Sequence, residues 1–122
     1  MQAGDVLLLR AGFIDPPKDK YVICIDPNQG YFFMINSAPW RATPRAQVRI
    51  RPHELQCLKH DSYVDTSKIV LFDKSETQEA LKDEPWRSMG SLSPMLCLRI
   101  KRAVNNHQHL PPVHARLVLD NL

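Results

Sequence analysis

The sequence predicts a mainly β fold of the α+β class: a compact, curved antiparallel sheet or small barrel of about five or six short strands, with helices late in the chain. Short apolar runs, rich in β-branched and aromatic residues, are separated by turn residues in the first part of the chain. Strand patterns do not alternate with long helical ones, and neither a glycine-rich phosphate loop nor an internal repeat is present. Parallel nucleotide-binding sheets and solenoids are therefore poor candidates.

The composition is that of an ordinary folded domain. The chain has 122 residues, of which 43% are hydrophobic and 24% charged, so it can bury one core and is neither disordered nor fibrous. No apolar run approaches the roughly 18 residues of a membrane span, and the first residues lack the pattern of a secretory signal. We therefore expect a cytoplasmic protein, with a barrel domain over residues 1–104 and a C-terminal extension over residues 105–122. The three widely spaced cysteines favour reduced, packed thiols.

The first strand is predicted by the apolar run 6–9, which follows a turn at Gly4-Asp5. The glycine and two prolines within residues 11–19 predict a loop after it. This loop leads into the next strand, so it is placed to act as a lid over any site at that edge of the sheet.

A hairpin is the best-supported feature of the sequence. Residues 20–25 and 31–35 are strand-like runs on either side of a turn at residues 26–30. Because a hairpin holds its two ends close together, Lys20 and Ser37 are expected to meet at one edge of the sheet. A cation and a hydroxyl at one place give the best chemical lead in the chain.

The middle of the chain predicts two further strand regions. Residues 47–51 alternate polar and apolar side chains, which favours an exposed strand with Arg49 and Arg51 on one face. Residues 52–60 fit either a short helical turn or an extended connection. Residues 61–72 predict another strand or pair of strands.

Two helices are predicted by their start signals, and a third by its composition. Residues 75–82 begin with Ser75 as a capping residue, and residues 95–104 follow Ser93-Pro94, a capping serine and a proline at the first helical position. Residues 86–92 are expected to return to the sheet between them. The apolar content of residues 113–119 predicts a short last helix docked on the body or on a partner.

Several short motifs occur in an order that resembles the PemK/MazF family of toxin endoribonucleases, over residues 4–104. They are Gly4-Asp5-Val6 opening a strand, a basic residue before the run Tyr21-Val22-Ile23-Cys24-Ile25, a strand ending in Ile35-Asn36-Ser37, and Gly90-Ser91-Leu92-Ser93-Pro94 opening a helix. The resemblance implies an SH3-like barrel of PemK/MazF type, acting as the toxin of a type II toxin-antitoxin system and usually a homodimer. It further implies a hydrolase that cuts single-stranded RNA without a metal or other cofactor and is inhibited by an antitoxin protein.

The resemblance also implies catalytic positions. Lys20 stands nearest to the family's arginine, and Ser37 matches its threonine or serine at the end of the third strand. A cation and a hydroxyl would stabilise the charge that develops when the ribose 2′-OH attacks phosphate, and Asp65 or His60 is expected to carry the proton. Lysine is a point charge and lacks the planar fork of arginine, so one alternative is a catalytically inactive barrel that binds nucleic acid or a protein partner. A plainer alternative is an interaction module that uses residues 113–119.

Basic and aromatic residues predict the rest of an RNA-binding surface. The candidate contacts are Arg10, Trp40, Arg41, Arg45 and Arg49, with Tyr31 as a second stacking surface, because single-strand binders combine cations with exposed rings. The alternative is a solvated strand face with one aromatic residue packed beneath it. His53, Cys57 and His60 would share one face of a helix, but no metal site is expected from them.

Overall fold

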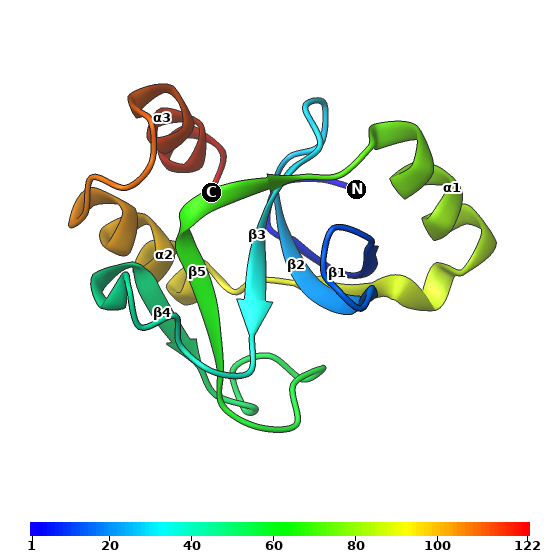
Figure 1. Ribbon diagram of the computed structural model, residues 1–122, viewed down its shortest axis with the longest axis horizontal. Coiled ribbons are helices and arrows are strands. Elements are labelled where there is room, and N and C mark those ends of the chain that lie inside the picture. Colours follow the sequence, from blue (N-terminus) through cyan, green and yellow to red (C-terminus); the bar gives the residue numbers. More distant parts are fainter.

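The computed structural model describes residues 1–122 and has one antiparallel sheet of six strands in the order β4-β5-β3-β2-β1-β6. The strands are β1 (Asp5–Ala11), β2 (Lys18–Asp26), β3 (Tyr31–Asn36), β4 (Gln47–Ile50), β5 (Ser62–Leu71) and β6 (Ser88–Ser91). The helices are α1 (Lys74–Asp83), α2 (Pro94–Asn105) and α3 (Pro112–Asn121), with single 3-10 turns at Pro44–Ala46 and Pro85–Arg87. The sheet is curled into a half-barrel (Figure 1), and with 31% helix and 33% strand the predicted α+β class is confirmed.

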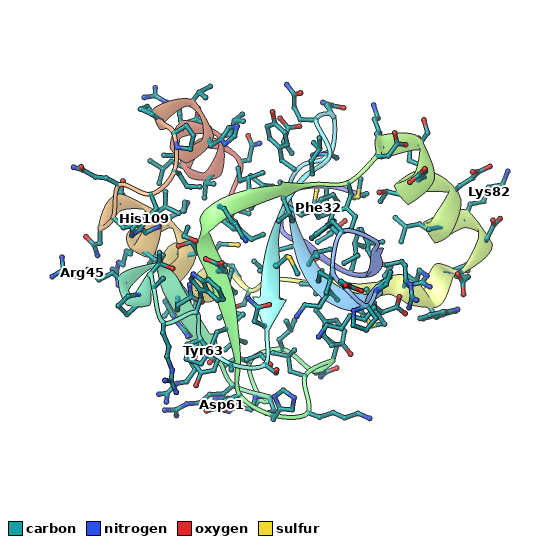
Figure 2. All side chains as sticks on the ribbon, in the orientation of Figure 1. Phe32, Arg45, Asp61, Tyr63, Lys82 and His109 are labelled. Carbon is teal, nitrogen blue, oxygen red and sulfur yellow. The ribbon has the colours of Figure 1, made fainter.

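The two faces of the sheet bury different cores. Figure 1 shows α1 on one side of the strands and α2 and α3 on the other. The larger core lies between the sheet and the latter pair, and it includes the fully buried Ile23, Phe33, Ile100 and Val118. The smaller core contains Leu7, Leu9, Val22, Cys24, Phe32 and Met34, with Leu81 of α1 packed against it. Phe32 is labelled within this smaller core in Figure 2.

The hairpin of β2 and β3 forms where the sequence predicts it. The Asp26 carboxylate accepts the backbone N–H of Asn28 at 3.0 Å, which closes the turn locally. Gly30 has φ +70°, and a Cβ at this position would lie 2.1 Å from the carbonyl oxygen of Phe72. Only glycine fits there, because the backbone of the segment after β5 crosses directly over the turn.

Strand β5 is bent, and the bend sets the position of the site described below. It pairs with β3 first through Asp65 and Met34 and then, after a shift in register, through Val70 and Phe32. The segment of β5 from Asp65 to Val70 thus lies opposite the much shorter segment of β3 from Phe32 to Met34. The extra residues form a bulge, which turns the strand sharply, as Figure 1 shows.

The first helix has a different cap from the one that the sequence predicts. The Asp73 carboxylate accepts the backbone N–H of Glu76 at 2.9 Å, so Asp73 is the N-cap and Ser75 lies inside the first turn. An aspartate serves this end of a helix as well as serine does and also complements the helix dipole. The predicted cap of α2 is confirmed, because Ser93 Oγ accepts the N–H of Leu96 at 3.2 Å.

The remaining segments follow the predictions in part. Residues 86–92 return to the sheet as β6, which pairs with β1. Helix α3 docks on the body: its Val118 is fully buried, and Asn121 Nδ2 donates to the carbonyl of Ile25 in β2 at 2.9 Å. Residues 52–60 form successive turns with no helix among them. None of the helices has the length and apolar character needed to cross a membrane.

The cysteines are unpaired, as the sequence predicts. Cys24 is fully buried in the smaller core, and burial raises the pKa of its thiol to about 12. Burial also raises the pKa of Cys57 and of Cys97. Thiols in this state are poor nucleophiles, so the three side chains contribute packing.

Candidate functional site

The ends of the β2–β3 hairpin meet at one edge of the sheet. Lys20 and Asn36 lie across from each other on the two strands, and Lys20 Nζ donates to Asn36 Oδ1 at 3.0 Å. Lys20 is half-buried, and its ammonium forms none of the five ion pairs of the protein. Burial and then the nearby Lys18 lower the pKa of Lys20. A partly desolvated cation without a carboxylate partner is a ready place for an anion.

Two hollows open on either side of this edge and share Lys20, Asn36 and Ser37. The first has a volume of about 380 Å³ and includes Tyr21 and His60 in its wall. The second has a volume of about 520 Å³ and lies over the other face of the sheet, where Asp65 and Trp40 contribute. The exposed Ser37 hydroxyl accepts and donates no hydrogen bond within the protein, so it is free for a ligand in either hollow.

His60 presents one ring nitrogen to solvent at the first hollow. Its Nδ1 lies 2.8 Å from the carbonyl oxygen of Asp61, and a carbonyl can only accept, so Nδ1 is the donor and, in the neutral ring, Nε2 is the acceptor. The loop that holds His60 is tied to the hairpin by the Tyr21 hydroxyl, which donates to the carbonyl of Cys57 at 3.2 Å. Asp61, labelled in Figure 2, marks the end of the sheet at which this loop lies.

Asp65 is an enclosed carboxylate with one oxygen already occupied. Only 4% of the residue is exposed, and its Oδ1 accepts Gln47 Nε2 at 3.0 Å, the Ser67 N–H at 3.0 Å and the Ser67 hydroxyl at 2.5 Å. Its Oδ2 has no hydrogen-bond partner in the protein. Gln47 Oε1 is the only side-chain polar atom that is both unpartnered and cut off from solvent, so Asp65 Oδ2 retains some exposure. Asp65 is also part of the wall of the second hollow. The β5 bulge makes this possible, since Ser67 belongs to the residues that it adds.

The rim of the second hollow is aromatic. Phe13 and Trp40 line it and are 58% and 60% exposed, high values for such large rings. Phe13 belongs to the loop between β1 and β2 and packs edge-to-face on Phe72, with ring centroids 5.7 Å apart. This loop borders the hollow, where the sequence places a lid; movement of the loop stays a prediction.

None of the predicted arginine contacts lines the two hollows at the Lys20 edge. Arg10 is exposed and lies 4.0 Å from Asp19, while Arg41 and Arg45 lie outside the walls of both hollows; Figure 2 shows Arg45 projecting at the periphery. Arg49 is exposed on edge strand β4, in a separate basic hollow of about 270 Å³ that it forms with Arg51, His53, Glu54 and Arg99. Of the predicted RNA contacts, only Trp40 is next to Lys20 and Ser37.

The predicted stacking role of Tyr31 and the shared helical face of His53, Cys57 and His60 do not agree with the structure. Tyr31 is half-buried and packs edge-to-face on His114 at 5.1 Å, so its ring is part of the α3 contact and does not face the hollows. His53, Cys57 and His60 lie on no helix, and no group of three or more histidine, cysteine or acidic side chains is arranged to hold a metal ion.

Asn36, Phe13 and Gln47 are the residues that sequence reasoning missed. Asn36 has a signal, because the hairpin register places it across from Lys20. Phe13 and Gln47 have none, since their positions depend on the course of a loop and on a bulge. No family model, curated protein or solved structure matches the chain.

Proposed function

We propose that this protein binds single-stranded RNA at the Lys20, Asn36 and Ser37 edge and cuts it without a metal, as a toxin-like endoribonuclease. The observation that carries the proposal is the Lys20 ammonium: it is half-buried, unpaired with any carboxylate and next to a free hydroxyl, between two hollows. A phosphate diester supplies the missing negative charge, and its oxygens accept from Lys20 Nζ and Ser37 Oγ.

The cleavage step follows from the groups around that phosphate. The ribose 2′ oxygen attacks phosphorus as its proton passes to His60 Nε2, and the bond from phosphorus to the 5′ oxygen breaks. The products are a 2′,3′-cyclic phosphate and a 5′-hydroxyl, the latter protonated by Lys20. Burial and Lys18 lower the pKa of Lys20, which makes its ammonium a better acid for the departing oxygen. His60 suits the role of base better than Asp65, because one oxygen of Asp65 is already occupied by its neighbours.

The biological setting belongs to the same proposal. The protein acts in the cytoplasm as a homodimeric toxin, and an antitoxin protein inhibits it. The support is the order of motifs in the sequence together with a curled antiparallel sheet of the kind that this order implies.

A second candidate function is nucleic-acid binding without cleavage. It is favoured by the setting of the exposed His60, whose ring hydrogen-bonds only to the backbone of its neighbour, with no side chain that fixes it toward Ser37. A lysine in place of the family's arginine also gives a weaker geometric match to phosphate.

The two candidates are separated by one assay. Purified protein is incubated with a labelled oligoribonucleotide in excess chelator, beside the same sequence made with 2′-deoxynucleotides. We expect the RNA to be cut to cyclic phosphate ends and the 2′-deoxy strand to remain intact. Ser37→Ala and Lys20→Ala should lower the rate, whereas Ser75→Ala and Lys82→Ala should not, since both control residues are exposed on α1; Figure 2 labels Lys82 at its far end. Intact RNA with retained affinity supports the binder, and intact RNA without affinity contradicts both candidates.

A further inference from the structure

The second hollow combines an apolar floor with two exposed rings. Ile14, Met34 and Val70 contribute apolar wall, and Phe13 and Trp40 stand at the rim. Rings that are more than half exposed do little for the core, and two of them at one hollow form a surface on which flat ligands stack. Nucleobases stack on such side chains whatever their sequence.

The hollow also carries a donor and an acceptor whose polarity is fixed. Lys20 Nζ can only donate, so the Asn36 atom that it contacts is Oδ1, and Asn36 Nδ2 is left as a donor without a protein partner. Asp65 Oδ2 is the unpartnered acceptor. The two residues are on neighbouring strands and the same face, because Asp65 pairs with Met34, two positions before Asn36.

Three of the four RNA bases match this pair. Adenine, cytosine and guanine each have an exocyclic amino group next to a ring atom that accepts. The amino group donates to Asp65 while the adjacent acceptor takes Asn36 Nδ2. Uracil has no amino group; if its ring N–H donates to Asp65 and one flanking carbonyl oxygen accepts from Asn36 Nδ2, the other carbonyl oxygen is left facing the carboxylate.

We propose that the second hollow is a nucleobase subsite that selects a base with an exocyclic amino group, through Asp65, between the rings of Phe13 and Trp40. This inference rests on the proposed RNA-binding function and extends it by naming the class of base next to the bound phosphate. Asp65 is a specificity residue in this scheme and takes no part in the chemical step.

The setting of Asp65 explains why such a subsite discriminates. Gln47 and Ser67 hold the carboxylate in one orientation, and the residue is 96% enclosed. A base that stacks over Asp65 without donating a hydrogen bond removes Oδ2 from water and leaves it without a partner, which costs the desolvation free energy of that oxygen. Sites built to hydrogen-bond a substrate group reject analogues that lack the group far better than apolar pockets reject a missing methylene.

The test uses RNA that cannot be cut. Fluorescein-labelled 2′-O-methyl hexamers of adenosine, of purine riboside and of uridine are titrated with the full chain, and binding is measured by anisotropy. Adenosine and purine riboside differ only in the amino group, so their ratio isolates the contact to Asp65. We expect the adenosine hexamer to bind about tenfold more tightly than either of the others.

Variants then assign the effect to residues. Asp65→Asn, which keeps the side-chain volume, should bring the adenosine to purine riboside ratio close to one. Phe13→Ala lies in an exposed loop, so it should fold normally and weaken all three hexamers together. Equal wild-type affinity for adenosine and purine riboside overturns the inference, as does the absence of binding to any hexamer. Cleavage of ordinary RNA is scored separately: cutting without amino-group selectivity overturns the subsite alone, and selectivity without cutting leaves the subsite and removes only the enzyme.

Discussion

Thr66 Oγ1 lies 2.7 Å from the carbonyl oxygen of Ala46 and 2.9 Å from His107 Nε2. The hydroxyl has a single hydrogen, and the carbonyl must receive it, so His107 Nε2–H donates to Thr66. The other ring nitrogen, Nδ1, accepts the backbone N–H of His109 at 3.1 Å. His107 is therefore a neutral ring whose two nitrogens are both used, and it joins the segment between α2 and α3 to the bend of β5.

Stability should fall in mild acid because of this histidine. Burial and then the neighbouring His109 lower the pKa of His107 from its ordinary value of 6.5. The unfolded chain therefore binds the proton first, and the stability that the neutral ring contributes is complete above about pH 6.5 and is lost as the pH falls toward the lowered pKa. The measurement is the Tm from circular dichroism over that interval.

His107→Gln provides the control for the acid effect. It cannot titrate, so its Tm should start lower but fall less steeply below about pH 6.5 than that of the wild type. His109→Gln tests the second cause of the lowered pKa, because it keeps the backbone N–H that His107 accepts and removes the neighbouring ring; its Tm should fall less in acid than that of the wild type and more than that of His107→Gln. Parallel Tm curves for the wild type and His107→Gln would rule out the assigned role.

The first helix offers a test of its cap. Asp73→Ala should lower the free energy of unfolding by about 1 kcal/mol, since the carboxylate holds the Glu76 N–H at 2.9 Å. Ser75→Ala should change it by less than about 0.5 kcal/mol, because Ser75 is an exposed residue of the first turn. Urea denaturation of both variants decides which residue caps the helix; a larger loss for Ser75→Ala contradicts the structural assignment.

Much of the fold follows from local sequence signals. The apolar periods of β2 and β3, the turn between them and the Ser93-Pro94 start of α2 each act within a few residues, and each is found where the sequence predicts it. The predicted N-cap of α1, Ser75, lies two residues after the observed one, Asp73, because both residues carry side chains that can cap a helix. Which one caps depends on where β5 stops, and that depends on tertiary pairing.

The candidate site is predictable only in part. A hairpin brings Lys20 and Ser37 together by local geometry alone, so that juxtaposition follows from the sequence. The place of Asp65 depends on a bulge in β5, and that of Phe13 on the course of a loop, and neither leaves a periodic pattern. The arginines of residues 41–51 look like one stripe in sequence, but only Arg49 and Arg51 share a hollow, and Arg41 and Arg45 are not among the residues that line it.

His60→Gln should abolish most cleavage without affecting the fold. The residue is exposed and the only hydrogen bond of its ring is to the backbone of Asp61, so the Tm should stay within experimental error of the wild type. Removing a general base lowers rates by about 10²- to 10⁴-fold, and single-turnover cleavage of a labelled RNA measures this. RNA affinity, measured on a 2′-O-methyl strand, should be unchanged. A cleavage rate equal to that of the wild type would mean that a group other than His60 accepts the proton.

Lys20→Arg separates binding phosphate from donating a proton. Arginine keeps the positive charge and adds a planar fork for phosphate oxygens, so RNA affinity should be retained or rise. It does not release a proton at accessible pH, so cleavage should fall by about 10²-fold or more if Lys20 protonates the departing 5′ oxygen. The wild-type rate should also decline in alkaline solution, as Lys20 loses its proton, with a midpoint below the ordinary lysine value of 10.5 because burial and Lys18 lower its pKa. That decline should be missing from the residual activity of Lys20→Arg, with RNA lacking protein as the blank for alkaline hydrolysis. Full activity of Lys20→Arg with an unchanged alkaline decline would show that Lys20 acts only as a charge.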